Sequence, residues 1–191
     1  TRILATRMQK VVHEFVAEGQ KGFVPHAFIA ECSMLMNLIE AYINDDSHPE
    51  RGALMLFLDM EKAFDRTSYG FLLKALDAVG FGRVFQRTVG MMYDEDNTPT
   101  RRIYANGFYS QPFGISSGVA QGCPLSPLLF LLVGQALKVA ISQQTDFVGV
   151  KSGGREIKTS QFADATALCI RGPGDLPAAI GPRGEGGLNN M

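Results

Sequence analysis

The stretch ALMLFLDMEKAFD, residues 53–65, decides the fold of this chain. Six successive apolar residues lead into an acid at Asp59, and the residues EKAFDRTS that begin at position 61 turn the chain. A short, continuous apolar run of this kind is typical of a β-strand that is buried on both faces. We therefore expect a strand over residues 53–59, with Asp59 at its end beside a buried sheet.

Helices are expected on both sides of this strand. Apolar residues at helical spacing predict helices over residues 1–19 and 27–43, and a short helix over residues 83–93. The helix directly after the strand ends at Gly80, which suits a C-terminal cap. Its predicted inner side consists of Phe71, Leu72, Ala75, Leu76 and Val79.

The second half of the chain combines turns, one long helix and short strands. Asn106-Gly107 between two strand-like runs predicts a hairpin. Ser126 as N-cap and Pro127 at the first helical position predict the start of a buried helix. FVGVKS, REIKTSQF and ATALCI are expected to form three short strands, the first two joined through Gly153-Gly154, and the last twenty residues hold six Gly and three Pro and indicate a loose or truncated tail.

Composition excludes several classes of protein. The 191 residues are 46% hydrophobic and 19% charged, which is ordinary for a globular core, and the net charge of -1 argues mildly against a nucleic-acid binder. The three cysteines form no CxxC pair and the three histidines have no metal-ligand spacing, so we expect neither disulfides nor zinc, and an intracellular compartment. The longest apolar stretch, from Pro127, is broken by polar residues and predicts no membrane span.

Two acids occupy unusual places. Asp59 ends an apolar strand, and Asp164 lies in FADAT between two strand-like runs. An acid beside a buried sheet is costly unless it is paired or binds a cation, and two such acids at strand ends suit Mg²⁺. The alternative is that each acid caps a turn or pairs with Lys62 or Arg66.

The glycine-rich stretch SSGVAQGCPLSP, residues 116–127, is a second candidate site. Backbone N–H groups in such a loop can approach a nucleotide closely, and the helix that follows favours anions at its N-terminus. Taken alone, the pattern also fits a plain loop before a helix that begins with proline.

The order of these motifs resembles that of reverse transcriptases from LINE-type (non-LTR) retrotransposons. Residues 59–65 (DMEKAFD) resemble the first palm motif of that family, residues 118–127 (GVAQGCPLSP) the second, and residues 162–164 (FAD) the catalytic hairpin. Upstream, residues 20–23 (QKGF) resemble the Q-x-G-F element before a fingers helix. The resemblance covers about residues 1–171.

The resemblance implies an α+β fold: the fingers and palm of a right-hand polymerase, with an antiparallel palm sheet backed by helices and without a thumb. It implies partial fingers over residues 1–52, a palm over 53–171 with a fingers-like insertion near 83–113, and a tail over 172–191. It implies RNA-directed DNA synthesis with Mg²⁺ as cofactor, and an RNA template, a DNA primer and dNTPs as partners, in the nucleus and without a membrane. It gives no oligomeric state.

Site roles follow from the same resemblance. It implies that Asp59 and Asp164 are catalytic metal ligands, and that the substrate contacts Met60, Phe64, Gln121 and Gly122. Phe64 also has a physical argument, because an aromatic ring under C2′ of the sugar leaves no room for a hydroxyl. Core packing is the alternative for Phe64.

Two substitutions depart from the family pattern. Ala165 stands where the family has a second aspartate, and Ala120 stands where it usually has a basic residue. Ala165 and the Gly/Pro-rich tail favour a second hypothesis: a catalytically dead reverse-transcriptase remnant that is inert or binds RNA. An RNA-templated RNA polymerase is a third hypothesis, which Phe64 disfavours.

Overall fold

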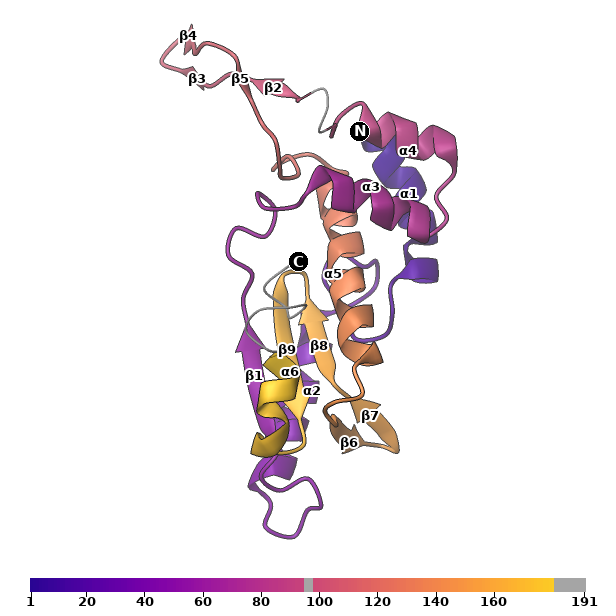
Figure 1. Ribbon diagram of the computed structural model, residues 1–191, viewed down its shortest axis with the longest axis vertical. Coiled ribbons are helices and arrows are strands. Elements are labelled where there is room, and N and C mark those ends of the chain that lie inside the picture. Colours follow the sequence, from indigo (N-terminus) through magenta and orange to yellow (C-terminus); the bar gives the residue numbers. More distant parts are fainter. Residues whose placement is uncertain (95–97, 181–191) are drawn as a thin grey trace. The chain divides into compact units, whose positions relative to one another are not determined.

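The computed structural model describes residues 1–94 and 98–180 (Figure 1). Contacts within the chain divide it into two compact units. The helical unit combines residues 1–15 with residues 61–133, and the sheet unit combines residues 16–60 with the chain from residue 134 onward. Each unit therefore contains two separate stretches of sequence. This division differs from the three consecutive ranges expected from the sequence, because contacts between distant segments, rather than chain order, define the units.

An antiparallel three-stranded sheet forms the centre of the sheet unit. Its order is β1 (Leu54–Leu58), β9 (Ala165–Ile170) and β8 (Thr159–Phe162). β1 and β9 pair along their length, from Leu54 opposite Ile170 to Leu58 opposite Thr166. The strand expected at residues 53–59 is thus confirmed to within one residue at each end, and its partner lies more than a hundred residues further along the chain.

Apolar clusters cover both faces of this sheet. On one face, Leu168 and Ile170 of β9 pack with Leu137 and Ile141 from helix α5 (Ser126–Gln143) and with Ala179 from helix α6 (Leu176–Ile180). On the other face, the buried residues are Ile39 from helix α2 (Ile29–Asn44), Ala53, Val150 and Cys169. Successive residues of a strand point to opposite faces, so β9 contributes to both clusters.

Phe57 corrects the expectation that β1 is buried on both faces. Its side chain is 68% exposed, whereas Met55 on the same face packs against the α2 cluster. β1 is an edge strand of the sheet, and the cluster on this face extends along the strand as far as Met55. A continuous apolar run therefore did not guarantee burial of every residue in it.

The helical unit contains α1 (Arg2–Phe15), α3 (Tyr69–Ala78), α4 (Arg83–Gly90) and the first half of α5. Its fully buried side chains include Met8, Val12, Leu72, Leu76, Val89 and Phe130. Gly80 follows α3 with φ +88°, a conformation that favours glycine, so the predicted cap is confirmed. Phe71 and Val79 were expected on the inner side of α3 but are 36% and 39% exposed. Tyr69 is buried in their place.

Helix α5 begins at Ser126, but the Ser126 hydroxyl does not act as the predicted N-cap. Its Oγ donates to the carbonyl of Ala120 at 2.6 Å and so ties the helix start to the glycine-rich loop. α5 is also long and apolar enough to cross a membrane by length and composition, which the shorter stretch considered in the sequence did not indicate. Because 56% of the helix is buried, it also fits the core helix of a globular protein.

Hairpins connect the remaining strands. β3 (Tyr104–Ala105) and β4 (Phe108–Tyr109) flank Asn106 and Gly107, which both have positive φ, so the predicted hairpin is confirmed. β2 (Thr100–Arg101) pairs with β5 (Phe113–Gly114). REIKTSQF was expected as one strand but forms two, because β7 (Arg155–Ile157) pairs with β6 (Val150–Ser152), whereas β8 pairs with β9.

The tail expected to be loose is ordered in its first part. Residues 173–175 form a 3₁₀ turn (η1, Pro173–Asp175) and α6 follows directly. Leu176, Ala178 and Ala179 pack on the sheet, which explains why this Gly/Pro-rich segment is held in place. Residues 181–191, the rest of the expected tail, lie outside the described residues.

An ion pair with a buried carboxylate links the two strands at one end of the β1–β9 pair. Arg171 follows β9 and donates to both carboxylate oxygens of Glu50, at 2.8 and 3.2 Å. The Glu50 side chain is only 3% exposed. The hydrogen bond from Arg171 lowers the pKa of Glu50, against the opposing effect of burial. The pair therefore stabilises the sheet where β1 begins and β9 ends.

Arg171→Met should leave the Glu50 carboxylate buried and unpaired, and should lower the urea midpoint of unfolding at pH 7. Because the pKa of Glu50 is lowered by folding, its contribution is present above the ordinary glutamate pKa and is lost as pH falls through the lowered value. The variant should therefore lose part of the acid sensitivity of the native protein between pH 7 and pH 3.

Arg51→Met is the matched control, because Arg51 pairs with Asp46 on the surface, where the two side chains are 62% and 85% exposed. Exposed pairs contribute little to stability. Equal urea midpoints for the two variants would contradict a stabilising role for the buried pair.

Candidate functional site

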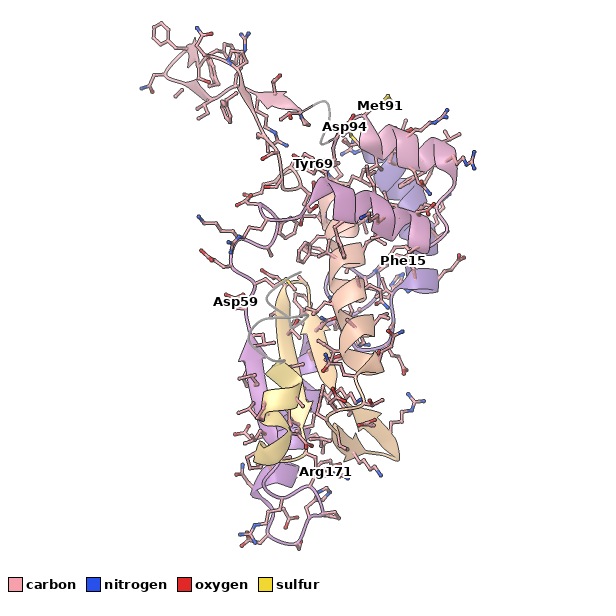
Figure 2. The ribbon with its side chains drawn as sticks, viewed as in Figure 1. Phe15, Asp59, Tyr69, Met91, Asp94 and Arg171 are labelled. Atoms are coloured by element: carbon pink, nitrogen blue, oxygen red, sulfur yellow. The ribbon has the colours of Figure 1, made fainter. Side chains whose placement is uncertain are left out.

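The pairing of β1 with β9 brings two acids to the same end of the sheet. Asp59 follows the last residue of β1, and Figure 2 shows it just beyond that strand. Asp164 lies in the two-residue turn between β8 and β9, where Phe162 pairs with Ala165. Two carboxylates that are more than a hundred residues apart in sequence thus stand at adjacent strand ends.

Ala165 is the first residue of β9 and directly follows Asp164. The β1–β9 ladder ends with Leu58 opposite Thr166, and one further step of this register would bring Asp59 opposite Ala165. Residues directly opposite in an antiparallel pair have Cβ atoms roughly 5 Å apart. Asp59 and Ala165 are exposed, and Asp164 is half-buried. A carboxylate at position 165 would accordingly be a neighbour of Asp59.

Lys62 and Arg66 were the alternative partners for the two acids, and in the described part of the chain neither of them forms an ion pair with Asp59 or Asp164. Arg66 forms an ion pair with Glu61 at 2.9 Å rather than with either candidate acid. Within residues 1–94 and 98–180, no ion pair involves Asp59 or Asp164, and no group of three His, Cys, Asp or Glu residues is arranged to hold a metal. Two carboxylates at one sheet end still suit Mg²⁺, which commonly takes one or two carboxylates and completes its shell with water and phosphate oxygens.

Met60 and Phe64 differ in their surroundings. The Met60 side chain packs against the apolar cluster of the sheet unit, so a contact with substrate would have to come from its backbone. Phe64 belongs to the helical unit, where its half-buried ring stacks on Phe130 of α5 with centroids 4.8 Å apart. This stacking provides the core packing that was the alternative for Phe64, and the ring still keeps an exposed part.

The glycine-rich loop is hydrogen-bonded to the turn that contains Phe64. Val119 N–H donates to the carbonyl of Phe64 and Gly118 N–H to that of Thr67, both at 2.8 Å. Gly118 has φ +90°, and a Cβ there would come within 2.7 Å of the Asp65 carbonyl oxygen. Only glycine permits this close approach, so the two family-like motifs of the helical unit form one hydrogen-bonded assembly.

Gln121 and Gly122 lie at the exposed side of this assembly. The Gln121 side chain donates to the Asp65 carboxylate at 3.3 Å. Gly122 has φ +79°, and a Cβ at this position would meet open space. Gln121 and Gly122 are therefore accessible to a ligand.

The six candidate residues are divided between the two units. The sheet unit brings together Asp59, Met60 and Asp164, whereas the helical unit brings together Phe64, Gln121 and Gly122. The unit boundary falls between Met60 and Glu61, inside the first motif.

Gln20 contacts the β8–β9 turn that carries Asp164, although it was not among the site residues predicted from the sequence. It is 3% exposed and hydrogen-bonds to both the N–H and the carbonyl of Ala163. The QKGF element signalled its importance, but residue spacing gave no reason to place it beside residues 162–164.

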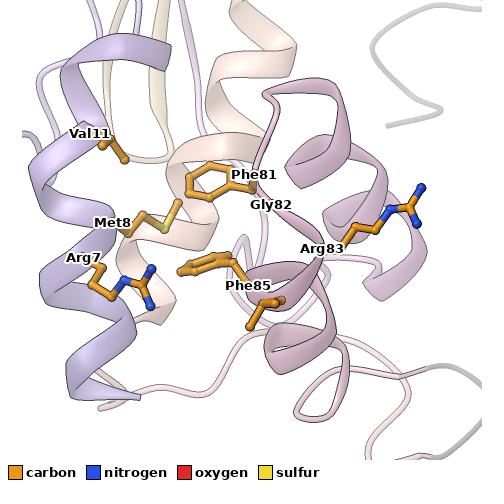
Figure 3. A pocket seen from close by; sticks show the side chains of 8 residues that line it. Arg7, Met8, Val11, Phe81, Gly82, Arg83 and Phe85 are labelled. Atoms are coloured by element: carbon orange, nitrogen blue, oxygen red, sulfur yellow. The ribbon is translucent and has the colours of Figure 1, made fainter.

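A pocket of about 400 Å³ lies elsewhere, within the helical unit. Figure 3 shows Met8 and Val11 of α1 facing Phe81 and Phe85, with Arg7 and Arg83 at the sides. None of the six candidate residues lines it. The pocket is mainly apolar and belongs to the packing of α1 against the segment that leads into α4.

Comparison with known proteins decides the family. The family profile "Reverse transcriptase (RNA-dependent DNA polymerase)" matches residues 1–181. The chain belongs to the reverse transcriptase family. It is 30% identical over 167 residues to a Pol polyprotein of the retrotransposable element R2DM of Drosophila melanogaster, and 32% identical over 168 residues to an R2 polyprotein of Popillia japonica. These matches identify a reverse transcriptase domain of the non-LTR retrotransposon type.

The two alignments cover 87% of this chain but only 15% and 22% of the relatives. This reverse transcriptase domain therefore spans less than a quarter of the curated relatives that it matches. Among solved structures, apo telomerase from Candida tropicalis aligns with 96% of this chain and 36% of its own, with a TM-score of 0.58 and 12% identity. That likeness supports the same mixed helix-and-sheet fold.

Ala165→Asp tests the geometry of the reverse transcriptase domain without requiring activity. The new carboxylate should lie opposite Asp59, and like charges in that relation cost on the order of 0.5 kcal/mol when no cation is present. We expect a lower melting temperature than the native chain in EDTA, and a larger increase on addition of Mg²⁺. Differential scanning fluorimetry over a Mg²⁺ series measures both.

Ala105→Asp, in the exposed β3–β4 hairpin, is the control for an added charge. The melting temperature of this control variant should not rise on addition of Mg²⁺. If Mg²⁺ raises the melting temperature of Ala165→Asp no more than that of this control, Asp59 and position 165 do not form a shared cation site.

Proposed function

We propose that this domain is the palm and part of the fingers of an RNA-directed DNA polymerase that uses two-metal nucleotidyl transfer. The observation that carries the proposal is the β1–β9 pairing, which sets Asp59 and Asp164 at adjacent strand ends. The sheet β1-β9-β8 would be the palm, and the helical unit would supply fingers contacts. The family membership supports the polymerase chemistry.

Asp59 and Asp164 would hold Mg²⁺, with the remaining positions filled by water and by phosphate oxygens of the incoming nucleotide. Metal ions held by Asp59 and Asp164 would supply alignment of the primer 3′-hydroxyl and stabilisation of the charge on the pyrophosphate leaving group. The protein's own contribution is to place the two carboxylates at the ends of paired strands. Rigid strand ends hold reacting groups more closely in place than loops do.

The substrates proposed are an RNA template, a DNA primer and dNTPs. Gln121 and Gly122 are exposed and would contact the nucleotide, together with the backbone of Met60. Phe64 would contact the sugar through the exposed part of its ring. A structural relative, telomerase from Candida albicans, was solved with a fragment of telomeric RNA, which agrees with an RNA partner for this fold. We propose a nuclear location on family grounds.

Ala165 makes this chain inactive or nearly so in our proposal. Losing one carboxylate removes negative charge that helps to hold two divalent ions, although Mg²⁺ accepts water in place of a missing ligand. Asp59 and Asp164 would then bind one ion weakly.

The second candidate function is a catalytically dead reverse-transcriptase remnant that is inert or binds RNA. Ala165 and Ala120 favour it, because a carboxylate and a cation that the family uses are both missing. The two candidates differ in one property: only the first regains activity when the carboxylate is restored.

Restoring Ala165→Asp in the full-length parent protein should raise Mg²⁺-dependent primer extension on an RNA template by about two orders of magnitude or more, since transition-state charge stabilisation of this kind is typically of that size. Incorporation of labelled dNTP is the measurement. The double variant Ala165→Asp with Asp59→Asn is the control and should be inactive.

Equal extension by the native parent and by its Ala165→Asp variant, both active, would show that the second carboxylate is dispensable. If neither protein extends the primer, the remnant is the correct interpretation.

Phe64→Val, made in the parent protein that carries Ala165→Asp, should relax sugar selection. Removing the ring opens space beneath C2′, so kcat/KM for rNTPs should rise relative to dNTPs by about tenfold or more, which corresponds to roughly 1.4 kcal/mol. Single-nucleotide incorporation kinetics measure the ratio.

Phe130→Leu removes the stacking partner of Phe64 and controls for loosened packing. If both variants discriminate between sugars as the parent does, Phe64 is a core residue only.

A further inference from the structure

The turn that carries Asp164 contains a residue in an unfavourable conformation. Ala163 has φ +55°, in the left-handed region that residues with a Cβ rarely adopt. It is also buried, with 8% of its surface exposed, so its N–H and carbonyl need partners within the protein. A positive-φ residue persists only where its surroundings fix it.

One side chain supplies both partners. Gln20 Nε2 donates to the carbonyl of Ala163 at 3.2 Å, and Ala163 N–H donates to Gln20 Oε1 at 3.0 Å. The primary amide is the side-chain group that can both donate and accept in this way. Gln20 thus holds the backbone on both sides of the Ala163 Cα, directly before Asp164.

Gln20 is itself held firmly. Its Oε1 also accepts from Gly22 N–H at 2.8 Å, and its backbone forms a parallel bridge with Gln161 of β8. On either side of the bridge, Gln161 N–H donates to Gly19 and Lys21 N–H donates to Gln161, at 2.7 and 3.0 Å.

Gly22 completes the fit between this segment and the turn. A Cβ at Gly22 would clash with the backbone nitrogen of Ala163, so a larger residue cannot be accommodated there without displacing the turn. The spacing Q-x-G therefore has a physical reason: glutamine reaches the turn, and glycine lets the segment approach it.

Two side chains from α5 anchor the same segment. Ala17 N–H donates to Gln135 Oε1 at 2.9 Å, and the Lys138 ammonium, which is 8% exposed, donates to the carbonyl of Glu18. The segment from Ala17 to Gly22 is thus fixed to α5 at one end and to the β8–β9 turn at the other.

We infer that Gln20 is a positioning residue that sets the β8–β9 turn so that Asp164 presents its carboxylate to a divalent cation. This role rests on the proposed function of Asp59 and Asp164 as metal ligands. Gln20 itself would touch neither metal nor substrate, because its amide is buried and already bonded to Ala163 and Gly22.

Gln20→Met tests the inference, since methionine keeps the length of the side chain but cannot make the two hydrogen bonds. We would make it in the full chain carrying Ala165→Asp, and follow two quantities by NMR: amide hydrogen exchange at Ala163, and the Mn²⁺ concentration that half-broadens the Asp164 amide signal. We expect exchange at Ala163 to become at least tenfold faster, and the Mn²⁺ midpoint to rise at least threefold. Exchange at Leu168 and Cys169 in β9 should not change.

Gln135→Met is the matched control. It removes a glutamine that holds the same segment through Ala17 but does not touch the turn, so neither quantity should change. Gln20→Asn, whose amide is one methylene too short to reach Ala163, replaces Gln20→Met if the latter does not fold, and the same two changes are expected.

The outcomes distinguish a failure of the proposed metal site from a failure of the positioning role of Gln20. If the Ala165→Asp chain does not bind Mn²⁺ at all, the proposed metal site fails, and the role of Gln20 fails with it. If Mn²⁺ binds with the same midpoint with and without the Gln20 amide, only the positioning role is wrong, whatever happens to exchange at Ala163. Unchanged exchange at Ala163 would also overturn that role.

Discussion

The antiparallel pairing of β1 with β9 is the constraint on which the sheet unit depends. β9 lies in the middle of the sheet, and Leu168, Cys169 and Ile170 are fully buried within it. Because alternate residues of β9 face opposite clusters, a slip of one residue would exchange the side chains that the two clusters receive. The observed register, which runs from Leu54 opposite Ile170 to Leu58 opposite Thr166, decides which residue comes next to Asp59.

The position of the acids changes the physical argument for their function. An acid at the end of an apolar strand suggested a buried and costly charge, but Asp59 is exposed. Asp59 and Asp164 stand at paired strand ends, where two carboxylates repel each other and a divalent ion would remove that repulsion. In the proposed site, Ala165 in place of a carboxylate would weaken both this repulsion and the affinity for a divalent ion.

Support for the turn comes from a segment far away in sequence. Gln20 and Ala163 are 143 residues apart, and yet the conformation of Ala163 depends on the Gln20 amide. Many functional sites keep an unfavourable backbone conformation in this way, because the surrounding structure leaves no alternative. The buried Lys138 belongs to the same support, and desolvation lowers its pKa.

The sequence by itself determined the features that depend on neighbouring residues. Asn106-Gly107 forms its hairpin, Gly80 ends its helix, and residues 54–58 form a strand, because φ preferences and apolar runs act over a few residues. The order of the motifs was likewise sufficient to indicate the family, which the comparisons confirmed. Only the tertiary structure decided that Phe57 is exposed, that REIKTSQF divides into two strands, and that residues 176–179 pack on the sheet. Only it set Gln20 against Ala163, because contacts between distant segments follow from how the whole core closes, and no local pattern carries that information.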